Sequence, residues 1–335
     1  MKKISILDIV TKSGVSLVTV SRVLNNVATV REGNRQKVLQ AIKELNYQPN
    51  SAARSLARGT TGLIGLTLVT LNDSVFHDIV QAVNEHLEEK GYFLALSISS
   101  PTQEEAEKQN SFLFQEDRVD GIIVLSPLNE KQIVMELKRK NIPFVIIDNH
   151  DDNTRAVTVN VDNYVGGFEA TKHLIELGHT HIAHVSGPEH FLSVRERKRG
   201  FEKALEQSGI APLAVTHTEF GIRSGFQAAT AWIEAGIVPT AVFAGDDALA
   251  LGAMDAFRAK GYRVPDDMSI IGYDNQLFAS EIHPQLTTIR QPVEQMGKEA
   301  VRLLLKLIGG AQRNSSVLLQ PQLIIRHSTA NYKHR

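Results

Sequence analysis

The stretch Ile6-Leu-Asp-Ile-Val-Thr-Lys-Ser-Gly-Val-Ser-Leu-Val-Thr-Val-Ser-Arg-Val-Leu-Asn25 decides the fold of the N-terminal part of this chain. Its apolar residues recur at helical spacing on both sides of Gly14, which predicts a helix, a tight turn and a second helix. Ile9 and Val10 belong to the inner face of the first helix, and Ser16 can cap the second. The pattern fits a DNA-binding helix-turn-helix and also an ordinary helical hairpin, so other features must separate the two.

The second helix of this stretch has an inner and an outer face. Val20 and Val23 face inward, whereas the outer face matches a recognition helix, which presents side chains to base edges in the major groove. Thr19 is better placed for a phosphate. The outward residues are Leu17, Val18, Ser21, Arg22 and Asn25. Because the first two are apolar, thymine methyl groups and DNA shape are expected to matter there, which leaves Arg22 as the main guanine contact.

Charge is distributed unevenly along the chain. The whole sequence carries a formal charge of -1, but residues 1–59 hold ten basic and three acidic residues, a net charge of +7 that leaves -8 for the remainder. A basic segment attached to an acidic body suits binding to a phosphate backbone, since counterion release depends on local charge. A solvated basic face is the alternative if charge is considered alone.

Composition favours a globular chain of about two domains, with 335 residues, 42% hydrophobic and 22% charged. The absence of cysteine excludes disulfides and thiolate metal ligands. Asp8 and Lys12 interrupt the apolar run after the basic start, so no secretory signal is expected, and no later stretch is apolar enough to span a bilayer. We therefore expect a cytoplasmic protein without a cofactor.

A third helix is expected from Asn34 to Leu45, and a distinctive segment, Asn46 to Gly59, follows it. The chain resembles the LacI/GalR family of bacterial transcription regulators in the runs Asp8-Ile-Val, Gly14-Val-Ser, Thr19-Val-Ser-Arg-Val-Leu-Asn25, Tyr47-Gln-Pro-Asn50 and Ala53-Arg-Ser-Leu56. The likeness continues nearly to the C-terminus. It implies a helix-turn-helix DNA-binding headpiece over residues 1–48, followed by a hinge helix and linker over residues 49–60.

In that family the hinge helix inserts a leucine into the minor groove, a role that falls by position on Leu56, with Ala53 beside it. Asn50 can cap this helix and Gly59 can end it. A helix of about eight residues is unstable alone, so it should order only when a partner hinge and DNA support it. A plain interdomain linker is the alternative. The DNA-binding residues expected on all these grounds are Ser5, Ile6, Ser16, Leu17, Val18, Thr19, Ser21, Arg22, Asn25, Thr29, Asn50, Ala53 and Leu56.

From Leu63 onward, short apolar strands alternate with helical periods, which is typical of parallel α/β sheets. Two such runs suggest two lobes, so the expected fold class is an all-α helix-turn-helix headpiece plus an α/β core. The resemblance implies a two-lobed, periplasmic-binding-protein-like core with parallel sheets and Rossmann-like lobes. It places this effector-binding and dimerisation core at 61–335, with lobe 1 at about 61–160 and 291–320 and lobe 2 at about 161–290 and 321–335. The expected strands are Leu63–Val69, Tyr92–Ser97, Gly121–Leu125, Pro143–Ile147, His181–Gly187, Ala214–His217, Thr240–Ala244 and Ser269–Tyr273.

A ligand of such a core would lie at the carboxyl ends of the strands, where open α/β sheets bind their ligands. Carboxylates there, paired with Arg197, could bind vicinal hydroxyl groups, because the carboxylates accept hydroxyl protons while the guanidinium donates. By resemblance, Phe220 and Phe76 match family positions against a sugar or base, and Gln291 falls at the third crossover between lobes. The expected effector-binding residues are Phe76, Asp148, Arg197, Phe220, Asp246, Asp274 and Gln291.

Alternatives remain for several of these residues. Asp247 is expected to cap the helix that follows its strand, and Arg197 could lie at the surface. The family usually has Asn-Asp where this chain has Asp246-Asp247, so the site is more acidic and favours a neutral sugar or polyol over a strongly anionic effector. The segment from Asn72 to Phe76 lacks the Asn-Pro-Phe of many relatives, which leaves the first-lobe contacts open.

Other functions fit less of the sequence. Carboxylates in a cleft could serve a glycoside hydrolase, and a solute-binding protein could share the core, but neither explains the headpiece. His179, His181 and His184 are unevenly placed for a metal site, and no phosphate-binding glycine pattern follows Leu63–Val69. The expectation is a non-enzymatic repressor, a homodimer or tetramer on near-palindromic double-stranded DNA, controlled by a sugar-like effector. Whether the effector induces or corepresses stays open.

Overall fold

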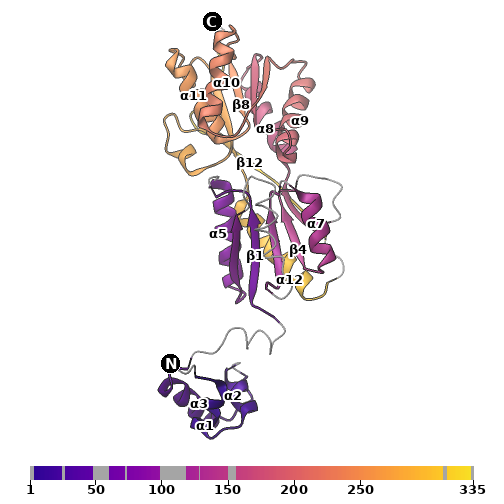
Figure 1. Cartoon of the computed structure of the whole chain (residues 1–335). Coiled ribbons are helices and arrows are strands. Elements are labelled where there is room, and N and C mark those ends of the chain that lie inside the picture. Colours follow the sequence, from indigo (N-terminus) through magenta and orange to yellow (C-terminus); the bar gives the residue numbers. More distant parts are fainter. Residues whose placement is uncertain are drawn as a thin grey trace. The chain divides into compact units, whose positions relative to one another are not determined.

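The chain forms two compact units, residues 1–62 and 63–335, each with its own core. Figure 1 shows a computed structural model of the whole chain. The structure describes residues 4–24, 27–47, 60–71, 74–98, 118–127, 129–149, 156–311 and 315–332.

The first unit is a headpiece of three helices. They are α1 (Ile6–Ser13), α2 (Leu17–Leu24) and α3 (Glu32–Glu44). Gly14 ends α1 with a φ of 65°, a left-handed conformation that lets the chain turn at once into α2. The third helix begins two residues earlier than expected, because the carbonyl of Arg31 accepts hydrogen bonds from the amides of Asn34 and Arg35.

Six buried apolar side chains from all three helices and the turn make the headpiece core. They are Ile9, Val15, Val20, Val23, Val38 and Ala41. The inner faces that helical spacing predicts therefore meet each other, and the opposite face of α2 is left to solvent.

The second unit contains two lobes, each built on a six-stranded sheet. The first sheet has the order β11-β5-β4-β3-β1-β2, with every strand pair parallel. The elements of this lobe are β1 (Leu63–Leu68), α5 (Ser74–Glu88), β2 (Phe93–Ile98), β3 (Gly121–Leu125), α7 (Glu130–Arg139), β4 (Phe144–Ile147), β5 (Thr158–Val161), α12 (Val293–Ile308) and β11 (Val317–Leu319).

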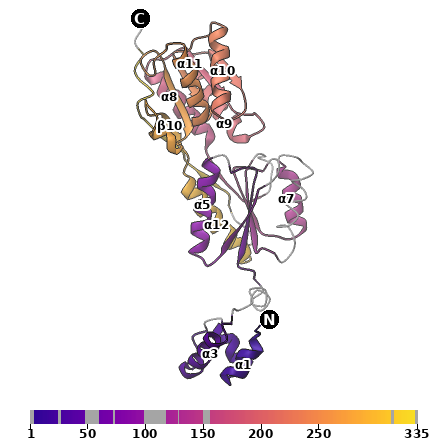
Figure 2. The same ribbon diagram turned by 60° about the vertical axis from the view of Figure 1, so that its left-hand side comes forward.

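Strand residues of the first lobe alternate between two apolar layers. Ile123 and Leu125 lie in one core with residues of α5 and α12, whereas Ile122 and Val124 lie in another with residues of α7. In Figure 2 the helices α5 and α12 accordingly lie on one face of the sheet and α7 on the other. Burial on both faces explains why these strands are almost continuously apolar in sequence.

The second lobe repeats this architecture with the order β12-β10-β9-β8-β6-β7, in which only the β10–β12 pair is antiparallel. Residues of α10 and α11 pack on one face and residues of α8 and α9 on the other. The elements are α8 (Asn163–Glu176), β6 (Ile182–Ser186), α9 (Leu192–Gln207), β7 (Ala214–His217), α10 (Ile222–Glu234), β8 (Ala241–Ala244), α11 (Asp247–Ala259), β9 (Ser269–Asp274), η1 (Leu277–Ser280), β10 (Thr287–Arg290) and β12 (Gln322–Ile324).

The chain passes three times between the lobes: after β5, after β10 and between β11 and β12. The predicted fold class is confirmed, and each of the eight expected strands is present within one or two residues of its expected ends. The four short strands beside the crossovers, β5, β10, β11 and β12, were not predicted. Among the described residues no helix has the length and apolar character needed to cross a membrane.

Candidate functional site

The outer face of α2 presents a short row of side chains to solvent. Leu17 and Val18 are 45% and 61% exposed, and Arg22 is exposed one turn further along. Ser16 precedes the helix, and its Oγ accepts from the Thr19 amide at 3.4 Å. Leu17 and Val18 thus lie outside the headpiece core and are accessible to a partner.

The other expected DNA-contacting residues differ in burial and in their hydrogen-bond partners. Ser5 donates from its amide and hydroxyl to the Asp8 carboxylate at 2.7 and 2.8 Å. Ile6 packs partly against the headpiece core, Ser21 is half-buried and Thr29 is exposed. The remaining expected contacts lie outside the described residues; they are Asn25, Asn50, Ala53 and Leu56.

Arg197, on α9, lies at the centre of a second group of expected site residues. It is 5% exposed, so the alternative of a surface position is wrong. Its Nε donates to Asn163 Oδ1 at 2.9 Å, its Nη1 to the Gly245 carbonyl at 2.6 Å and its Nη2 to Asp274 Oδ1 at 3.3 Å. Three hydrogen bonds in different directions fix the plane of the guanidinium.

A close approach between α8 and α9 determines where Arg197 lies. A Cβ at Gly167, on α8, would lie 2.1 Å from the Arg197 carbonyl oxygen, a distance that no side chain can occupy. The two helices therefore meet backbone to backbone at this point. Tyr273, on β9, supports the same residue from another side, with the guanidinium carbon 3.6 Å from the ring centroid.

Asp274 ends β9 and accepts two hydrogen bonds at Oδ1, from Arg197 and, at 2.6 Å, from Gln291 Nε2. Its backbone has a φ of 106°. Burial raises the pKa of the Asp274 carboxyl, and the Arg197 charge opposes that rise. Gln291 lies directly after β10, where the chain leaves this lobe, so one carboxylate contacts both α9 and a crossover.

Asp148 follows β4 of the first lobe and accepts from Ser126 Oγ at 3.0 Å. Burial raises the pKa of the Asp148 carboxyl, while the Arg197 charge lowers it. Asp148 and Asp274 also affect each other, since the negative charge of Asp148 raises the pKa of Asp274. Electrostatic influence thus extends from the first lobe to the second at this place.

Asp246, and not Asp247, caps the helix that follows β8. Asp246 has extended backbone angles, φ -147° and ψ 174°, and its side chain accepts from the Leu249 amide at 2.5 Å, so Asp246 is the N-cap of α11. The expectation that Asp247 caps this helix is wrong. Asp247 is already the first helical residue, and its carboxylate accepts instead from Thr288 Oγ1 and the Gln276 amide.

The structure brings together five of the seven expected effector residues, which we call the Arg197 cluster: Asp148, Arg197, Asp246, Asp274 and Gln291. The Phe220 ring lies against Gly187, which neighbours Gly245, an acceptor for Arg197, whereas Phe76 is held within the first lobe. Phe76 is partly buried against the core of the first lobe. Phe220 is 38% exposed, and its ring centroid is 5.7 Å from that of Phe191.

Sequence reasoning missed two partners of the Arg197 cluster. Asn163 opens α8 directly after Asp162, which caps that helix by accepting from the Val165 amide. The available signal was the polar pair Asp162-Asn163 directly after β5, but β5 is a short Thr-Val-Asn-Val segment that was not predicted as a strand. Tyr273 was included only as a strand residue.

The cluster combines hydrogen-bond acceptors with one guanidinium donor. Three carboxylates offer acceptors for hydroxyl groups around one guanidinium that already donates to Asp274. In the part of the chain that the structure describes, no group of three or more His, Asp or Glu side chains could hold a metal ion. His184 instead hydrogen-bonds to the Phe243 carbonyl at 2.8 Å inside the second lobe, and His179 to Ser269 Oγ at 2.9 Å.

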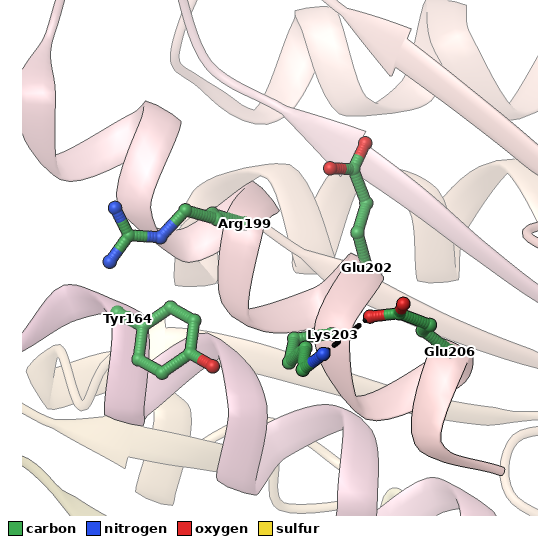
Figure 3. A pocket seen from close by; sticks show the side chains of 5 residues that line it. All are labelled: Tyr164, Arg199, Glu202, Lys203 and Glu206. Atoms are coloured by element: carbon green, nitrogen blue, oxygen red, sulfur yellow. Dashed lines mark hydrogen bonds and ion pairs between the residues drawn. The ribbon is translucent and has the colours of Figure 1, made fainter.

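A separate hollow lies between α8 and α9 (Figure 3). Both of its cations have partners within the chain: Lys203 Nζ is 2.6 Å from Glu206, and Arg199 Nη2 is 2.8 Å from Glu196. Exposed pairs of this kind contribute little energy. The lining residues are Tyr164, Arg199, Glu202, Lys203 and Glu206, and none of them belongs to the Arg197 cluster.

A helix-turn-helix headpiece before a two-lobed α/β core defines the class of ligand-responsive DNA-binding regulators. Residues 5–50 match the family described as bacterial regulatory proteins, lacI family, and residues 171–329 match a periplasmic binding protein-like domain. The chain belongs to the lacI family, and it is a DNA-binding transcription regulator with an effector-binding domain.

Similar proteins cover nearly the whole chain. The HTH-type transcriptional repressor PurR of Aliivibrio fischeri is 36% identical over 98% of both sequences. A lac repressor dimer, solved bound to operator and the anti-inducer ONPF, is 33% identical with a TM-score of 0.91 over 98% of this chain and 100% of that chain. The regulator CelR in complex with cellobiose is 30% identical with a TM-score of 0.75 over 97% of this chain and 100% of that chain.

Proposed function

We propose that this chain represses transcription as a homodimer whose two headpieces bind half-sites about one helical turn apart in a near-palindromic operator. The observation that supports this most is the exposed face of α2, where Leu17, Val18 and Arg22 are presented above the buried Val20 and Val23. Major-groove recognition requires this separation of faces. The chain acts in the cytoplasm and catalyses no reaction.

Successive parts of the chain have different roles in this proposal. Residues 1–48 bind DNA, residues 49–60 connect and switch, and residues 61–335 bind the effector and the second subunit. Lobe 1 takes about 61–160 and 291–320, and lobe 2 about 161–290 and 321–335. Effector binding changes the relation between the lobes and shifts operator affinity by a coupling of about 1–3 kcal/mol.

The effector is a neutral, polyhydroxylated molecule such as a sugar or polyol, held by the Arg197 cluster with Phe76 and Phe220. Arg197 already pairs with Asp274, and Asp148 and Asp246 add negative charge nearby. An anionic ligand would therefore meet net repulsion, whereas hydroxyl groups would find acceptors. The relatives solved with cellobiose and ribose are consistent with this class.

Mobility-shift assays on genomic fragments test the DNA function. Wild-type protein should shift a specific fragment, Arg22→Ala should lose the preference for it, and Lys2→Ala should weaken binding to all DNA alike. Absence of any specific fragment, or an equal loss on random DNA for Arg22→Ala, would contradict the proposal.

Melting-temperature measurements with sugars, sugar acids, polyols and purines identify the effector, because a ligand of the native state raises apparent stability. Arg197→Ala should still bind the operator but lose the response to that compound. Loss of operator binding together with the response would contradict separate sites.

A further inference from the structure

Asp247 is completely buried, with 0% of its surface exposed, yet it is not the helix cap that its position suggests. Both of its carboxylate oxygens accept a hydrogen bond from outside α11. Oδ1 accepts from Thr288 Oγ1, on β10, at 2.5 Å, and Oδ2 accepts from the Gln276 amide at 2.7 Å. One side chain thus joins α11, the turn after β9 and the strand that leads to a crossover.

The turn after β9 needs such support. Asp274 has a φ of 106°, which non-glycine residues adopt only where the surroundings hold them, and Asn275 follows in the left-handed region with a φ of 60°, which asparagine tolerates. Thr288 contributes again, since its Oγ1 accepts from the Asn275 amide at 3.3 Å. Asn275 Oδ1 also accepts from Arg326 Nη2 at 2.5 Å.

This strained turn directs Asp274 toward its two donors. Asp274 Oδ1 receives Arg197 Nη2 and Gln291 Nε2 from different elements. We propose that Asp247 is a positioning residue for the effector site: with Thr288 it holds the 274–276 turn so that the Asp274 carboxylate faces Arg197 and Gln291. This inference rests on the proposed effector site.

The chemistry of the two donors explains why a carboxylate is present. Thr288 Oγ1 accepts from the Asn275 amide, so its own proton is directed to Asp247, and the Gln276 amide can only donate. An asparagine has one acceptor oxygen and would turn its NH₂ group toward one of these donors. Burial raises the Asp247 pKa well above its usual range, and the hydrogen bonds from Thr288 and the Gln276 amide oppose that rise because they favour the ionised carboxylate.

Space around Asp247 is equally restricted. A Cβ added at Gly272, on β9, would lie 2.2 Å from Asp247 Oδ1. The carboxylate therefore occupies volume that the strand has left free for it. Replacement by a longer acid does not fit, so Asp247→Asn is the informative substitution, and Thr288→Val removes the partner hydroxyl with little change of shape.

The test uses the full chain with Asp247→Asn, Thr288→Val and the control Thr288→Ser, which keeps the hydroxyl. Hydrogen exchange of the Gln276 amide should be faster by about tenfold or more in the first two variants and unchanged in the control. The side-chain amide NMR signal of Gln291, assigned by its loss in Gln291→Leu, should move toward its solvent-exposed position in the same two variants. The double variant should show no further change, because both substitutions remove one interaction.

Wild-type values of both signals in Asp247→Asn or in Thr288→Val would overturn the proposal, and so would equal changes in Thr288→Ser. Thr288→Val decides the matter if Asp247→Asn does not fold. Neither readout needs an effector. If the regulator responds to no compound, the proposed effector function is refuted. The role of Asp247 is still decided by the hydrogen-exchange and NMR measurements.

Discussion

Removing the charge of Arg197 should destabilise the second lobe, chiefly because the buried Asp274 carboxylate then lacks its counter-charge. The Arg197 and Asp274 side chains are each 7% exposed. In Arg197→Met, Asp274 keeps the hydrogen bond from Gln291 but loses the guanidinium with which it is paired. Removal of one member of a buried ion pair costs about 3–5 kcal/mol, most of it from the uncompensated charge.

The double variant Arg197→Met/Asp274→Asn separates this cause from lost packing. It contains no stranded carboxylate, so it should recover about half or more of the loss. Urea unfolding of the full chain can be followed by fluorescence, because the one tryptophan, Trp232, is 4% exposed in the core of the second lobe. Equal unfolding free energies for the single and double variants would refute the reasoning, since the loss would then come from packing alone.

Three further substitutions should change stability, two through packing and helix propensity and one through protonation. Gly167→Ala should cost at least about 1–3 kcal/mol, because its Cβ would lie 2.1 Å from the Arg197 carbonyl oxygen; Gly33→Ala, on α3 with nothing within 4 Å, should instead stabilise the headpiece by up to about 1 kcal/mol. Thermal unfolding of each unit checks both, and a neutral Gly167→Ala would contradict the close approach. Burial lowers the pKa of His184 to about 3 from 6.5. The neutral His184 therefore contributes fully to the free energy of unfolding well above pH 6.5. This contribution falls on acidification, by about 2 kcal/mol between pH 6.5 and 5. The unfolding free energy of His184→Phe should depend less on pH in this window, and an unchanged slope would show that His184 is not the group responsible.

The sequence predicted the elements whose pattern is long and regular. Strands such as β1 and β3 were found because burial on both faces makes them continuously apolar. The strands β11 and β12 have three residues each, too few to show a period. β5 (Thr-Val-Asn-Val) and β10 (Thr-Thr-Ile-Arg) have only four residues each and mix polar with apolar side chains, so their assignment as strands depends on neighbours that are distant in sequence.

The candidate site was partly predictable for a related reason. Strand ends bring Asp148 and Asp274 to the same edge of their sheets, which is a matter of topology. The division of roles between Asp246 and Asp247 was not predictable, because either aspartate can cap a helix and only the backbone angle of Asp246 decides between them. Asn163 was missed because its strand was missed.

The central claim is that α2 recognises base sequence. The ratio of operator affinity to random-DNA affinity, measured for the full chain at fixed salt, tests it most directly. Wild-type protein should select a near-palindromic sequence from a randomised pool, and Arg22→Ala should lose about 1–3 kcal/mol of discrimination per half-site while its affinity for random DNA changes far less. A wild-type ratio near one, or a ratio that Arg22→Ala leaves unchanged, would contradict the account.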